Sequence, residues 1–104
     1  MKERLSDFLD GLFQGRETTI ALDLKLNLKK IVGESSLTED QALVAFGSVA
    51  AAVNLGSVVD FASSELQAMG RSPEAIREVY GFTVDQVHDI ARIASVTAAA
   101  GGLL

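Results

Sequence analysis

The sequence predicts an all-α domain, a compact bundle of about five or six helices. Apolar residues recur at spacings of three and four along most of the chain, which is the period of an amphipathic helix. Capping residues and glycines divide the chain into segments of helical length. The 104 residues, 48% apolar and 22% charged, fit one globular domain that spans residues 1–104.

The first helix is predicted within residues 1–15. Its apolar side chains lie three and four residues apart and are separated by polar ones, so they share one face of a short amphipathic helix. Gly15 is expected to end this helix, because glycine is common just after a helix C-terminus. The apolar face consists of Leu5, Phe8, Leu9, Leu12 and Phe13.

Residues 20–28 carry conflicting signals. Every second residue from Leu22 to Leu28 is a leucine, and strict alternation is typical of a strand. Leucine and lysine favour helices, however, and a lone strand would lack a pairing partner. We therefore predict a helix with two apolar stripes, contacted by its own core and by a neighbouring subunit. One stripe contains Ile20, Leu24, Leu28 and Ile31, and the other contains Leu22 and Leu26.

A central helix is predicted after a loop at residues 33–36. Thr38 and Gln41 form a capping box at its start. Nearly every residue from 42 to 53 is apolar, so this helix should have no solvated face. Residues 42–59 lack formal charge, but their alanine, glycine and serine content and their acidic flanks argue against a membrane span.

Three further helices complete the prediction. Residues 54–56 break the central helix, and Ser57 with Asp60 is expected to cap the next one, which ends before Gly70. Another helix is predicted from Pro73 to Gly81, because proline is favoured at the first helical position.

The last predicted helix begins with a second capping box, Thr83 to Gln86, and runs toward Gly101-Gly102. Its spacing predicts a buried face and a polar face. The predicted buried face contains Val84, Val87, Ile90, Ala91, Ala94 and Ala98, and the polar face contains Asp85, His88, Asp89 and Arg92.

Two segments suggest a family. Residues 22–28 read Leu-Asp-Leu-Lys-Leu-Asn-Leu and residues 37–41 read Leu-Thr-Glu-Asp-Gln, which resembles the early part of alkylhydroperoxidase D. Residues 90–96 are similar to the closing helix of carboxymuconolactone decarboxylase-like proteins. The likeness covers residues 22–100. It implies an all-α fold, a helix at residues 22–28 and an oligomer, commonly a trimer or hexamer. Together with the two apolar stripes, this predicts a homo-oligomer (dimer, trimer or hexamer) with helix contacts that include Leu22 and Leu26.

The resemblance does not extend to the chemistry of the family. Active members use a Cys-x-x-Cys pair with an upstream glutamate and a downstream histidine, and this chain has no cysteine. A thiol peroxidase needs a thiolate and a resolving thiol, so this activity is excluded. Glu39 lies near the family glutamate, but a helix N-terminus explains it equally well. The cysteine positions fall on Leu55 and Val58 or on Gly56 and Val59, and the histidine position falls on Ala62 or Ser63.

Other catalytic candidates are weak. His88 could be a general base oriented by Asp85, but a solvated helix face with ion pairs to Arg92 explains the same residues. Asp85, His88 and Asp89 supply too few well-placed ligands for a metal. Glu65 could have a raised pKa in an apolar pocket, or it could point outward.

An anion site is a further weak candidate. Arg71, Arg77 and Tyr80 could line one, but surface contacts are the simpler interpretation. No cofactor is implied by any of these patterns.

The net charge of the chain limits the classes of macromolecule that it is expected to bind. A net charge of −5 and a pI near 4.7 disfavour nucleic acid, because the phosphate backbone is also negative. The absence of cysteine and of a signal-like N-terminus suggests a cytoplasmic protein.

Three functions stay open. The one that we favour is a non-catalytic oligomeric domain with a structural or partner-binding role. The others are a small-molecule binding module with an apolar inter-subunit cleft, and a cysteine-independent decarboxylase-like enzyme that uses His88 or Glu65.

Overall fold

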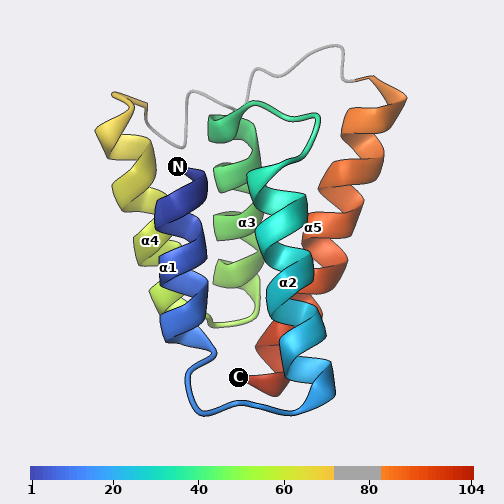
Figure 1. The fold of residues 1–104 in the computed structure, drawn as a ribbon. Coiled ribbons are helices and arrows are strands. Elements are labelled where there is room, and N and C mark those ends of the chain that lie inside the picture. Colours follow the sequence, from blue (N-terminus) through green and yellow to red (C-terminus); the bar gives the residue numbers. More distant parts are fainter. Residues whose placement is uncertain (72–82) are drawn as a thin grey trace.

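A computed structural model describes residues 1–71 and 83–104, and these residues form five α-helices (Figure 1). The all-α prediction is thereby confirmed. The helix predicted at residues 73–81 lies outside the described residues. The helices are α1 (Lys2–Leu12), α2 (Thr19–Gly33), α3 (Glu39–Ala52), α4 (Gly56–Ala68) and α5 (Val84–Leu103).

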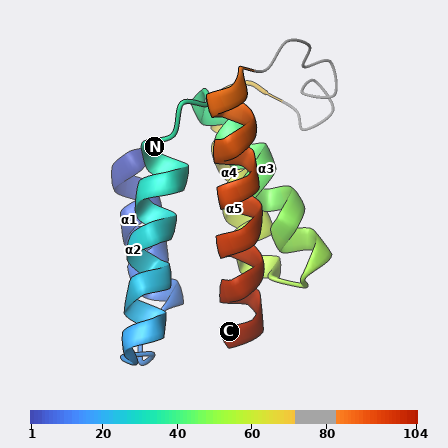
Figure 2. The ribbon, with the colours of Figure 1, turned by 90° about the vertical axis from the view of Figure 1, so that its right-hand side faces the viewer.

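The five helices form two layers. Figure 2 shows α1 and α2 side by side in one layer, and α3, α4 and α5 in the other. Helix α3 packs against α2, α4 and α5, so it is central as predicted. Its outward side is nevertheless exposed at Ser48, Ala51 and Ala52, and the expectation of a helix without a solvated face is wrong there. Among the described helices, none is long and apolar enough to cross a membrane.

The alternating leucines belong to helix α2. Thr18 caps it, with its side chain accepting a hydrogen bond from the Ala21 backbone N–H at 3.2 Å. Ala21, Leu28 and Val32 are buried against the core. Ile20, which the prediction placed in the core stripe, is 66% exposed, because the buried face of α2 runs through Ala21, Leu28 and Val32 instead.

The starts of α3 and α5 confirm both capping boxes. In each, the threonine hydroxyl accepts a hydrogen bond from the backbone N–H three residues later. The side-chain oxygen of the glutamine at that later position accepts a hydrogen bond from the backbone N–H of the threonine. The start of α4 corrects the prediction that Ser57 is its cap. Asn54 adopts a left-handed φ of 62°, which turns the chain early, and α4 begins at Gly56 with Leu55 as N-cap and no side-chain cap.

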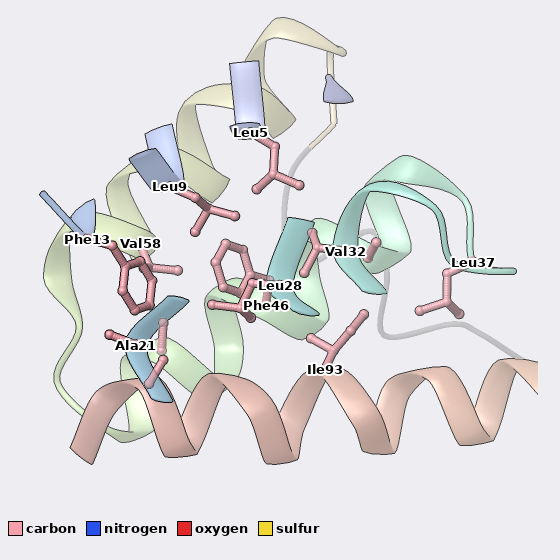
Figure 3. Packing of buried hydrophobic residues seen from close by; sticks show 13 residues of the cluster. Leu5, Leu9, Phe13, Ala21, Leu28, Val32, Leu37, Phe46, Val58 and Ile93 are labelled. Carbon is pink, nitrogen blue, oxygen red and sulfur yellow. The ribbon is translucent and has the colours of Figure 1, made fainter. Parts of the chain in front are cut away.

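The core lies between the two layers (Figure 3). Phe46 of α3 is fully buried at its centre. The side chains around it come from four other helices: Leu5, Leu9, Leu28, Val32, Val58 and Ile93. Leu5, Leu9 and Phe13 confirm the predicted apolar face of the first helix.

The buried face of α5 differs from the predicted one. Ile93, Thr97 and Ala100 are buried, whereas Val84 and Val87 are exposed. Alanines occur on all sides of this helix and each buries little area, so their positions do not indicate which side is buried. The buried side is the one that carries the larger Ile93. The buried face also includes the Thr97 hydroxyl, which has no hydrogen-bond partner among the described residues.

Candidate functional site

A groove between α3 and α4 is the first candidate site. It has a volume of about 180 Å³ and mainly apolar walls, with the hydroxyl groups of Ser48 and Ser63 as its polar side chains. The two helices approach closely here: a Cβ added to Gly47 would lie 2.9 Å from the Cβ of Ala62. The lining residues are Leu43, Val44, Gly47, Ser48, Ala51, Val59, Ala62, Ser63 and Leu66.

The groove was not predicted from the sequence. Its signal is a set of small residues on two successive helices, and these were interpreted only as a sign of close helix packing. The groove-lining side of α3 is turned away from the side that carries Phe46 into the core. The groove is therefore an outward-facing feature of the α3, α4 and α5 layer.

The second candidate site is the α2 ridge, which we define as Leu22 and Leu26. These leucines are one helical turn apart and are 42% and 59% exposed. Both were predicted to face away from the chain's own core, and the structure places them so. The sequence pattern of two apolar stripes thus has one stripe largely against the core and one in contact with solvent.

Charged side chains lie beside the α2 ridge: three lysines on the next turns of the helix, and the exposed Asp23 one turn before Leu26. Lys25 and Lys29 both form ion pairs with Asp10 of α1, at 3.4 Å and 2.6 Å. The hydrogen bond from Lys29 is the main cause that lowers the pKa of Asp10. Lys30 is exposed and forms no ion pair with the residues that the structure describes.

Glu65 is buried on α4 and bound to Arg4 of α1. The guanidinium donates two hydrogen bonds to the carboxylate, Nε to Oε1 at 2.7 Å and Nη2 to Oε2 at 2.9 Å. The hydrogen bond from Arg4 outweighs desolvation and lowers the pKa of Glu65. Neither of the two interpretations considered for Glu65 holds: its pKa is lowered, not raised, and the residue is only 6% exposed and so does not point outward.

Replacing Glu65 by glutamine tests this pairing through its pH dependence. Because the folded-state pKa lies below the ordinary value of 4.5, the carboxylate stabilises the fold above that pH and the contribution is lost as the pH falls through the folded pKa. E65Q should lower the free energy of unfolding by about 1 kcal/mol near neutral pH. Urea unfolding across the acidic range should show this difference disappearing.

Glu17→Gln is the matched control, because Glu17 is exposed in the connection between α1 and α2. This variant should stay within about 0.5 kcal/mol of the wild type, as is usual for a surface substitution. An E65Q deficit that persists unchanged in acid would mean that the Arg4–Glu65 charge pair is not its source.

His88 is exposed on α5 and does not line the groove. Arg92 pairs with Asp89 at 3.1 Å, and the carboxylate of Asp89 also accepts hydrogen bonds from the backbone N–H and hydroxyl of Ser36. These bonds tie the loop before α3 to α5. They match the interpretation of a solvated helix face with ion pairs. Within the described residues, no group of acidic or histidine side chains could hold a metal ion.

The two catalytic candidates are not brought together. Glu65 faces α1, where Arg4 lies, whereas His88 belongs to α5 on the other side of α3 (Figure 1). Three residues were candidates for an anion site. The Nε of Arg71 lies 3.6 Å from Oδ2 of Asp40, so this guanidinium forms a surface ion pair. Arg77 and Tyr80 lie outside the described residues.

Val58 and Val59, two of the positions that the resemblance would match to cysteines, lie in the first turn of α4. Val58 is buried in the core and Val59 lines the groove, and an aliphatic valine side chain is not a nucleophile. Comparison of the chain with protein-family models, with curated proteins and with solved structures finds no match. What the fold and sites define is an all-α domain of five described helices without cysteine, which presents an apolar ridge and an apolar groove on its surface.

Proposed function

We propose that this chain is a non-catalytic, redox-inactive association domain that assembles into homo-oligomers through the α2 ridge. The observation that carries the proposal is the exposure of Leu22 and Leu26 on adjacent turns of one helix. Burying a leucine side chain fully is worth roughly 1.5–3 kcal/mol relative to leaving it exposed to water. A second copy that covers both leucines therefore gains a free energy of this kind from each.

The sequence supports the same role. The run at residues 22–28 is the segment that most resembles alkylhydroperoxidase D, and we propose an alkylhydroperoxidase D-like ancestry in which the oligomer contacts were kept and the thiols were lost. The absence of cysteine leaves no thiol chemistry for the domain to perform.

The other two functions receive less support. A decarboxylase-like enzyme would need Glu65 or His88 at a substrate site, but Glu65 is neutralised by Arg4 and His88 is away from the groove. The groove volume of about 180 Å³ is below the roughly 300–1,000 Å³ of typical ligand pockets. It suits a pair of aliphatic side chains better than a metabolite.

The test compares the solution mass of the wild type with that of the double variant Leu22→Ser, Leu26→Ser. At about 200 µM, which exceeds the micromolar Kd that a small interface gives, light scattering should show an oligomer for the wild type and the 11.0 kDa monomer for the variant.

Ile20→Ser is the matched control, because Ile20 is even more exposed than the ridge leucines but lies two residues from Leu22, which places it on a different side of α2. This variant should keep the wild-type mass. Equal loss of mass in I20S, or no loss in the ridge variant, would contradict the proposed role of the ridge.

A further inference from the structure

We infer that the α2 ridge of one copy docks into the α3–α4 groove of a second copy. This inference rests on the proposed self-association and specifies its partner surface. Each chain would then present one ridge and one groove, so that the interface is heterologous, a different surface from each of the two copies.

Size and shape support this pairing. An apolar cavity of about 150 Å³ holds one benzene molecule, so the groove, at about 180 Å³, can admit aliphatic side chains of similar bulk. Leu22 and Leu26 are adjacent on one helix and project together, as ridges that pack into the groove of a neighbouring helix pair do. The exposed Ser48 and Ala51 leave the groove open for a helix to approach.

Charge complementarity supports it independently. Lys25, Lys29 and Lys30 lie near the ridge on neighbouring turns, together with Asp23, which precedes Leu26 by one turn. Lys25 and Lys29 already pair with Asp10, so Lys30 is the lysine that a second copy can use. The groove has acidic residues at its edges instead: Asp60 precedes Ser63 by one turn of α4, and Asp40, which already pairs with Arg71, precedes Val44 by one turn of α3. Asp60 is exposed and forms no ion pair with the described residues, as is also true of Lys30.

The same charges disfavour the symmetric alternative. If two copies met ridge to ridge, the lysines of both α2 helices would converge, and Asp10 and Asp23 on each copy offset them only in part. Like charges brought together across an interface oppose association. A ridge in a groove avoids this repulsion and places Lys30 of one copy on the side of the carboxylate of Asp60 of the other.

The positions of the two surfaces set the form of the assembly. The ridge lies on α2, and the groove lies on the outward side of α3 and α4. Figure 2 shows α2 in one layer and α3 and α4 in the other. One copy can therefore bind two neighbours at once. Such contacts produce a closed ring or an open chain of subunits.

A mixing experiment tests the inference. The ridge variant carries Leu22→Ser with Leu26→Ser, and the groove variant carries Ser48→Arg with Ala51→Arg at two exposed positions, which fills the groove and repels lysine. Each variant alone should have the 11.0 kDa monomer mass. An equimolar mixture should form a heterodimer of twice that mass, because one intact ridge and one intact groove are present. Circular dichroism should show both variants to be folded.

Each alternative result is informative. A groove variant that still forms oligomers, or a mixture that stays monomeric, overturns the ridge-in-groove inference while the proposed self-association stands. A wild type that is monomeric under the same conditions overturns the proposed function itself, and with it the inference, and points to a different protein as the partner.

Discussion

Replacing Phe46 by alanine is expected to lower the free energy of unfolding by about 4 kcal/mol. Phe46 is fully buried where side chains from the other four helices meet. Its removal takes away the burial of a large ring and leaves a cavity whose walls belong to both layers, so the surroundings cannot easily collapse to fill it. Urea unfolding followed by circular dichroism measures the loss.

Val84→Ala is the control, because Val84 is 70% exposed on α5. Its effect should stay within about 0.5 kcal/mol. A Phe46→Ala loss no larger than that of the control would mean that the two layers do not share one core.

Introducing valine at Gly47 is expected to cost about 3 kcal/mol. Even a single Cβ at this position would lie 2.9 Å from the Cβ of Ala62, and that atom is fixed to the α4 backbone. Helices α3 and α4 must then separate, which disturbs the core and widens the groove. Urea unfolding measures the stability.

The matched control is Gly11→Val in α1, where an added Cβ meets nothing within 4 Å. Because valine is a slightly better helix former than glycine, this change should be neutral or stabilise by about 0.5 kcal/mol. Similar effects of the two substitutions would show that α3 and α4 do not approach closely at Gly47.

Local signals predicted the helices well because their causes are local. The Thr38–Gln41 and Thr83–Gln86 capping boxes involve residues only three apart, and both form as predicted. The failed cap at Ser57 has a local cause too: the left-handed Asn54 starts α4 earlier than the serine signal implied. Residues 20–28 needed a wider argument, namely that a strand there would have no partner.

The sites were harder to predict because they depend on contacts between distant residues. Arg4 and Glu65 are 61 residues apart in the sequence, and nothing near either residue indicates the other. The buried face of α5 could not be read from its pattern, since the many alanines fit several faces. The exposure of Leu22 and Leu26 was predictable, because a second apolar stripe cannot face the same core as the first.

The central claim is self-association, and sedimentation equilibrium of the wild-type chain over a wide range of concentrations tests it most directly. We expect the weight-average mass to rise above 11.0 kDa as the concentration increases, and to fall back at high salt because charge complementarity contributes. A mass that stays at 11.0 kDa at every concentration would contradict the claim.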